Sequence, residues 1–211
     1  MTLRRSCFQP IAIIETMSGH FGDLMAPTSS TGLQTTTTTR ISDLLSFSPL
    51  ERILLTANGN LQRIVSSYHA KPVQVKVTYN NETSTIGIFH RQVTLHLNQS
   101  EIPFCCATSK VTVKNEEMLR AIASNEIGIG QLFRRFDTLP VFTLLAVRRG
   151  ECTNPKELVS QETELPPLTE TDRLEVNGPF WRLYRLEAAA GIECVIHEQF
   201  QGKVLDICET V

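Results

Sequence analysis

Arg91 and Glu198 each lie in a segment with the alternating pattern of a β-strand. Successive side chains point to opposite faces of a strand, so residues two apart share a face. The side chains that share a face with these two charges are apolar: Val93, Leu95 and Leu97 in the first segment, and Cys194, Ile196 and Phe200 in the second. Both charges are therefore predicted to point into the protein.

A buried charge costs on the order of several kcal/mol unless another group compensates it. One outcome is structural: Arg91 and Glu198 pair with each other, or they reach the solvated rim of the sheet. The other outcome is functional: Arg91 binds an anionic ligand, and Glu198 accepts a hydrogen bond or a proton from that ligand. We call this assignment of alternate residues to opposite faces of a strand parity. Parity alone leaves both outcomes open, because ion pairs also occur in protein cores.

Other residue patterns indicate no further chemistry. The histidines show no metal-ligand spacing with a partner acid and the cysteines form no C-x-x-C pair, so we expect no metal centre. Gly128-x-Gly130 lacks the third glycine and the preceding strand of a dinucleotide fingerprint, and predicts a tight connection instead. The basic pairs at 134–135 and 148–149 are expected to be solvated.

Composition sets limits on the class of protein. The chain has 211 residues, 41% of them hydrophobic, with a net charge of -2. It lacks the broad basic field of non-specific nucleic-acid binders, and no apolar run reaches the roughly 18 residues of a membrane-spanning helix. The chain has six cysteines, but a chain of this length does not need disulfides for stability, so we expect reduced thiols. We therefore expect a cytoplasmic protein, a monomer or homodimer, whose partner is a small-molecule substrate.

The first 42 residues differ from the rest. They contain a run of threonines and few periodic apolar positions, which is typical of a loosely attached arm. Glu15 and Asp23 argue against a targeting peptide, since such peptides are poor in acidic residues. We predict an N-terminal arm over residues 1–42 and one domain over residues 43–211.

Helix signals open the domain. Ser48-Pro49-Leu50-Glu51 predicts a helix start with a capping box, and Asn58-Gly59 predicts its end. A second helix is predicted over 61–68, and Asn115 is predicted to cap a third.

Strands dominate the remainder. Alternation predicts strands at 73–79, 86–97, 103–113, 141–147, 180–187 and 193–199, with a long surface loop over 148–178. Consecutive strands joined by short turns favour an antiparallel sheet over a doubly wound one. The predicted class is α+β, an antiparallel sheet with flanking helices.

Five segments stand in order between about residue 45 and residue 206. They are residues 51–61, Pro72-Val73-Gln74-Val75, Arg91-Gln92-Val93-Thr94-Leu95, residues 127–133, and Trp181-Arg182 with the later Ile196-His197-Glu198-Gln199-Phe200. In this order they resemble the chorismate lyase superfamily, in which chorismate is converted to 4-hydroxybenzoate and pyruvate. Residues 127–133 look like the family's Pro-Leu-Gly-x-x-Leu-Phe signature.

The resemblance assigns roles to the two inward charges. In that family the arginine of the matching strand holds a ligand carboxylate, and the glutamate of the last strand meets the ring hydroxyl. Arg91 and Glu198 occupy those places, so they are the implied catalytic residues. The resemblance also implies ligand contacts at Ile129 and Gly130, a buried ligand pocket beneath mobile helical flaps, and no metal or organic cofactor.

This chain departs from the family in the segment 107–112. Where the family has the stretch Ala-Arg-Ser-x-Ile-Pro, this chain has Thr108 in place of the arginine and Thr112 in place of the proline. The resemblance thus also implies that Thr108 is a substrate-binding residue. Because this chain lacks the family's arginine there, the charge of its ligand is expected to depend on this position.

The reaction implied is a carbon–oxygen lyase reaction on chorismate or a close analogue. Much of its driving force lies in forming the aromatic ring, so the site mainly binds, orients and shields the substrate. Two alternatives stay open. One is a divergent lyase, cyclase or pericyclase of specialised metabolism that uses the same pocket, and the other is a non-catalytic protein that binds an aromatic acid.

Overall fold

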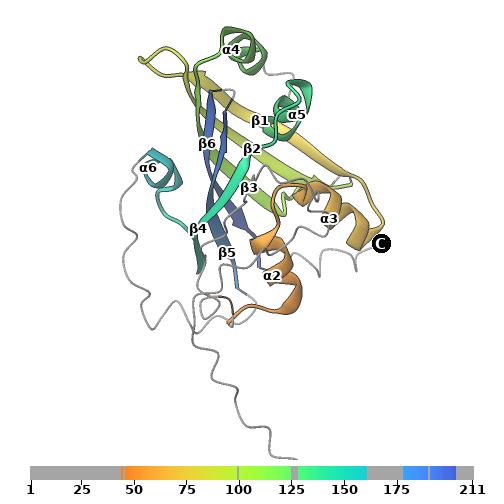
Figure 1. Ribbon diagram of the computed structural model, residues 1–211. Helices are drawn as coiled ribbons and strands as arrows, with labels where there is room; N and C mark the ends of the chain where they lie inside the picture. The colour runs from red at the N-terminus through yellow and green to blue at the C-terminus, as the bar shows by residue number, and fades with distance from the viewer. Residues whose placement is uncertain are drawn as a thin grey trace, which may run out of the picture.

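Six strands form one antiparallel sheet with helices on both faces, so the predicted α+β class is confirmed (Figure 1). The computed structural model describes residue 44 and residues 46–98, 100–124, 128–160, 178–189 and 191–202. The helices are α2 (Pro49–Thr56), α3 (Leu61–His69), α4 (Glu116–Ala123), α5 (Ile129–Arg135) and α6 (Pro155–Ser160). The strands are β1 (Val73–Glu82), β2 (Ile88–Leu97), β3 (Cys105–Val113), β4 (Val141–Arg149), β5 (Phe180–Ala188) and β6 (Ile192–Phe200). The arm predicted over residues 1–42 lies outside the described residues.

The strand order is β1-β2-β3-β6-β5-β4, and every neighbouring pair is antiparallel. After β3 the chain passes through α4 and α5 to the edge strand β4, then returns through β5 to β6. β6 therefore lies between β3 and β5 in the middle of the sheet. Side chains on β6 meet neighbours from both halves of the chain, which local sequence patterns do not show.

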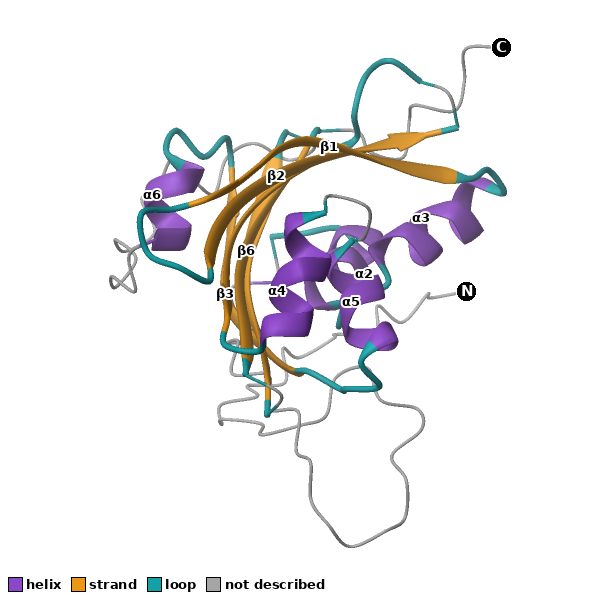
Figure 2. Cartoon of the chain, turned by 90° about the horizontal axis from the view of Figure 1, so that it is seen from above, coloured by secondary structure: helices purple, strands orange, loops and turns teal. Residues whose placement is uncertain are grey.

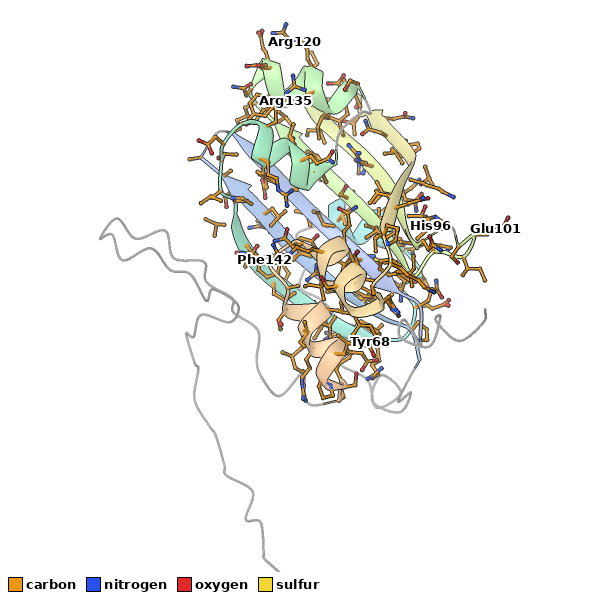
Figure 3. All side chains as sticks on the ribbon, turned by 90° about the vertical axis from the view of Figure 1, so that its right-hand side faces the viewer. Tyr68, His96, Glu101, Arg120, Arg135 and Phe142 are labelled. Atoms are coloured by element: carbon orange, nitrogen blue, oxygen red, sulfur yellow. The ribbon has the colours of Figure 1, made fainter. Side chains whose placement is uncertain are left out.

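The sheet curves around α2, α3, α4 and α5, and α6 lies on its other side (Figure 2). We call the face toward these four helices the inner face and the face toward α6 the outer face. In Figure 3 the helices stand in front of the sheet. Phe142 on β4 lies toward one margin of the sheet and His96 on β2 lies toward the other. The main hydrophobic core fills the layer between these helices and the inner face, with helix side chains that include Leu54, Leu55, Val65, Met118, Ile122 and Leu132. Burying each such side chain contributes about 1.5–3 kcal/mol.

The start of α2 follows the predicted capping box. The Ser48 side chain accepts from the Glu51 N–H, and the Glu51 side chain accepts from the Ser48 N–H. Beyond the helix, Gly59 and Asn60 have φ angles of 68° and 56°, in the left-handed region that turns the chain into α3. The predicted stop at Asn58-Gly59 is therefore confirmed.

A buried ion pair fastens α2 to β4. Arg149 Nη2 lies 2.8 Å from Glu51 Oε2 and donates to the Ser46 carbonyl at 2.7 Å. Burial alone would raise the pKa of Glu51, but hydrogen bonds from Arg149 and Ser48 outweigh it and hold that pKa below its ordinary value. The prediction of a solvated Arg149 was wrong, because Arg149 on the last position of β4 finds the capping carboxylate of another element.

Two predicted loops contain helices. Gly128 is the N-cap of α5, so Ile129 and Gly130 form its first turn and do not form a tight connection. The predicted loop over 148–178 begins inside β4 and contains α6, which packs over β3 and β6. Residues 161–177 of that loop lie outside the described part of the chain. Helices of six or seven residues leave too short a periodic pattern to detect in sequence.

The alternation predicted for β1 holds only in its first half. A bulge between Val77 and Tyr79 shifts the register, so Tyr79 pairs with Gln92 on the outer face. Val75 and Val77 keep the inner parity, yet both are exposed because β1 is an edge strand at the margin of the helix layer.

His197 makes the stability of the fold depend on pH. It points to the outer face and is 1% exposed beside Trp181, and burial lowers its pKa from 6.5 to about 4. The unfolded chain binds a proton at about pH 6.5 and the folded chain only near pH 4, so stability is full above pH 6.5 and falls by about 3 kcal/mol as pH drops to 4. Denaturant titrations across this range should show the loss.

His197→Phe should remove this part of the pH dependence, because the ring stays but the titrating group does not. The matched control His69→Gln changes another buried histidine and should keep the dependence. An identical pH profile for the wild type and His197→Phe would contradict the assignment.

Candidate functional site

Arg91 and Glu198 both lie on the inner face, as parity predicted. Arg91 is 2% exposed and Glu198 is 6% exposed. The backbone register places them on different strands: Arg91 pairs with Ser109, which pairs with Ile196, two residues before Glu198. Their α-carbons are thus about 10 Å apart across the strands and about 7 Å apart along them.

Glu198 pairs with Arg182 of the neighbouring strand. Arg182 and Glu198 are directly opposite in the β5–β6 register, and Arg182 Nε lies 2.7 Å from Glu198 Oε2. The Tyr184 hydroxyl donates to Glu198 Oε1 at 2.9 Å. The guanidinium carbon of Arg182 also lies 4.5 Å from the centre of the Tyr184 ring. We call these three residues the Glu198 cluster.

The Glu198 cluster also holds the end of α2. Arg182 Nη1 donates to the carbonyls of Leu55 and Ala57, at 3.2 and 2.7 Å. These carbonyls belong to the C-terminal end of the helix, where backbone acceptors lack helical partners and the dipole favours a cation. Burial alone would lower the pKa of Arg182, but Glu198 and Tyr184 outweigh it and raise that pKa. The cluster therefore keeps one charged arginine between the sheet and the helix layer.

Tyr184 stays protonated and acts as a hydrogen-bond donor. Burial, and after it the adjacent Glu198 charge, raise the pKa of Tyr184 well above its ordinary value. Each carboxylate oxygen of Glu198 can accept about two hydrogen bonds. Arg182 and Tyr184 supply one to each oxygen, so capacity is left for a ligand hydroxyl.

Arg91 lies in a different part of the inner face. Its register neighbours are Asn80 on β1 and Ser109 on β3. The Asn80 side chain donates to the Ile122 carbonyl at 2.9 Å, in the last turn of α4, so Arg91 stands beside the point where α4 meets the sheet. Burial lowers the pKa of Arg91, which means that its charged form is less favourable here than in water.

The structure separates Thr108 from the other predicted substrate-binding residues. Thr108 pairs with His197 in the β3–β6 register, and its neighbour Ala107 pairs with Glu198. Side chains alternate across a strand, so Thr108 points to the outer face while Glu198 points to the inner face. Thr108 and Glu198 therefore lie on opposite faces of the sheet, and a substrate-binding role for Thr108 stays a prediction.

Ile129 and Gly130 lie in the helix layer. Ile129 is half-buried at the start of α5 and packs against the main core, and Gly130 follows it in the same turn. Both are on the helical side of the inner face. A ligand role for them stays a prediction.

Arg182 and Tyr184 were not predicted as partners of Glu198. A signal was present: Tyr184 and Arg182 share the parity of Phe180 and Leu186 in residues 180–187, which puts a third charge on an apolar face. The same test that selected Glu198 selects Arg182. Their pairing could not be read, since it needs the register between β5 and β6.

Among the described residues, no group of three or more His, Cys, Asp or Glu side chains could hold a metal ion. The four cysteines in this part of the chain, Cys105, Cys106, Cys152 and Cys194, are all free thiols. In the same residues, none of the helices is both long and apolar enough to cross a membrane.

No family model matches this chain, and no curated protein matches it. Among solved structures the chain is similar to a possible transcriptional regulator, YydK from Bacillus subtilis subsp. subtilis str. 168, with 13% identity and a TM-score of 0.36. The similarity covers 66% of this chain and 61% of that one, so this chain spans less than two thirds of that protein's length. A likeness at this TM-score does not bear on the function of this chain.

Replacing Glu198 should test how much the cluster stabilises the fold. Glu198→Gln leaves the buried Arg182 charge without its counter-ion, so we expect a loss of about 3–5 kcal/mol in the free energy of unfolding. Tyr184→Phe removes one hydrogen bond but keeps the ion pair, and should cost about 2 kcal/mol. Urea unfolding compares the two variants. A Glu198→Gln loss no larger than the Tyr184→Phe loss would show that the ion pair is not the main contact.

Proposed function

We propose that this protein is a chorismate lyase-like enzyme that binds chorismate, or a close analogue, on its inner face and eliminates pyruvate to give a hydroxybenzoate. The observation that carries the proposal is the position of Arg91: a guanidinium 2% exposed on the helix-covered face of the sheet. An arginine fork suits a carboxylate. Burial lowers the pKa of Arg91 and so disfavours its charged form, and the negative charge of a bound anion would stabilise that form.

Glu198 supports the proposal through its unused acceptor capacity. In the elimination the C4–H bond breaks, its electron pair enters the ring and the ether bond at C3 breaks. The leaving enolpyruvyl group takes up the proton lost from C4 and becomes pyruvate, while the ring becomes aromatic. The hydroxyl on C4 can donate to Glu198 throughout. Since Arg182 and Tyr184 fix both carboxylate oxygens, the role we assign to Glu198 is to orient that hydroxyl.

The helix layer has a role in shielding. α2, α4 and α5 bury apolar side chains against the inner face on which Arg91 and Glu198 lie. A dry environment strengthens the contact between Arg91 and a carboxylate. Ile129 and Gly130, at the first turn of α5, are the proposed backbone contacts of the ligand.

A second candidate function is binding of an aromatic acid without turnover. It is favoured by the engagement of Glu198, whose two oxygens each already accept a hydrogen bond inside the protein. A carboxylate held in this way suits recognition of a hydroxyl as well as it suits catalysis. The two functions share a ligand class and differ in whether pyruvate is released.

Pyruvate release tests the main proposal. Purified protein incubated with chorismate should release pyruvate, followed with a coupled dehydrogenase, together with equimolar 4-hydroxybenzoate. Tight binding of 4-hydroxybenzoate with no pyruvate would select the non-catalytic function instead. Failure to bind either chorismate or 4-hydroxybenzoate would contradict both functions.

Arg91→Met tests the proposed carboxylate contact. Methionine keeps the apolar stem among the inner-face side chains but removes the charge, so affinity for 4-hydroxybenzoate should fall about 100-fold. Arg185→Ala is the matched control, because Arg185 lies on the outer face in an ion pair with Glu193. Calorimetric titration gives both affinities. An Arg91→Met affinity equal to that of the control would remove Arg91 from the site.

A further inference from the structure

One side-chain nitrogen of Arg182 has no hydrogen-bond acceptor among the described residues. Its Nε donates to Glu198, and its Nη1 donates to the carbonyls of Leu55 and Ala57. Its Nη2 is buried and has no hydrogen-bond partner among the described residues. The whole Arg182 side chain is 0% exposed.

A buried donor without an acceptor is costly, and buried polar groups in folded proteins are rarely left in that state. The other buried arginine of an ion pair, Arg149, shows the contrast: its Nε, Nη1 and Nη2 all donate to Ser46 or Glu51. Each side-chain nitrogen of Arg149 therefore has an acceptor, whereas Nη2 of Arg182 has none among the described residues. The acceptor for that donor therefore lies outside the described residues.

The register places Arg182 across the inner face from Arg91. Arg91, Ser109, Ile196 and Tyr184 form one row across four strands, and Arg182 lies two residues from Tyr184. The α-carbons of the two arginines are therefore three strand spacings apart across the sheet, about 14 Å, and two residues apart along it, about 7 Å. Glu198 lies on β6, the strand between those of Ser109 and Arg182.

From these observations we propose that Arg182 is a second anion-binding residue of the inner face, whose Nη2 donates to an oxygen of the ligand. The inference rests on the proposed function and deepens it. Arg91 takes one carboxylate, Glu198 takes a hydroxyl, and Arg182 takes a second acidic group. The ligand class is then a hydroxylated ring that carries two carboxylates, and a monocarboxylate leaves Nη2 unsatisfied.

Two unreactive probes that differ by one acidic group test the inference. One is 4-hydroxybenzoate, and the other is 3-(carboxymethoxy)-4-hydroxybenzoate, a dianion with no enolpyruvyl group to lose. Wild-type protein should bind the dianion about tenfold or more tightly than the monoanion. Arg182→Lys keeps a cation beside Glu198 but lacks Nη2, so the two affinities should become nearly equal. The matched control Arg149→Lys makes the same change in the other buried pair and should keep the preference.

The wild-type protein gives a second measurement in case Arg182→Lys fails to fold. Guanidinium ¹⁵N–¹H resonances assigned to Arg182 should shift when the dianion is added and stay in place with the monoanion. Equal affinities for the two probes in the wild type, lost together in Arg91→Met, would overturn the role of Arg182 and leave the proposed function standing. Arg182 resonances that do not shift when the dianion is added would also overturn the role of Arg182, and would indicate that Nη2 donates to a water molecule. Binding of neither probe to the wild type would overturn both.

Discussion

The contact between Arg182 and Glu198 joins the two layers of this protein. Arg182 lies on the sheet, pairs with Glu198 on the adjacent strand, and donates to the carbonyls at the end of α2. One cation thus satisfies a carboxylate and a helix terminus, each of which is costly to bury alone. Because Tyr184 adds a hydrogen bond to the same carboxylate, the position of α2 over the sheet depends on a cluster rather than on apolar packing alone.

This arrangement divides the inner face into two regions. Near the middle of the sheet the polar groups are held by one another, through Arg182, Glu198 and Tyr184. Toward β1, Arg91 lies beside the junction of α4 with the sheet, where its charged form is disfavoured by burial. A fixed acceptor therefore lies on one side of the inner face and a buried cation on the other. The ligand we propose, with a carboxylate at one end and a hydroxyl at the other, would match that direction.

Parity explains both the successes and the failures of prediction. It was right for Arg91 and Glu198, because alternation across a strand is a local rule that a few residues reveal. The alternation does not extend to Tyr79, since the bulge after Val77 inserts a residue and changes the face. Thr108 lies on the face opposite Glu198, since its register partner is His197. The helices α5 and α6 were missed because so few turns carry no clear period.

Local sequence is enough to predict the class of fold, the start of α2 at its capping box and the inward direction of two charges, since each depends on residues within one or two turns or strands. Which groups those charges meet depends on how distant strands and helices pack. Glu198 meets Arg182 because β6 lies between β3 and β5, and Arg149 meets Glu51 because the end of β4 reaches the start of α2. Such pairings depend on strand order and layer packing, which bring together residues far apart in the chain.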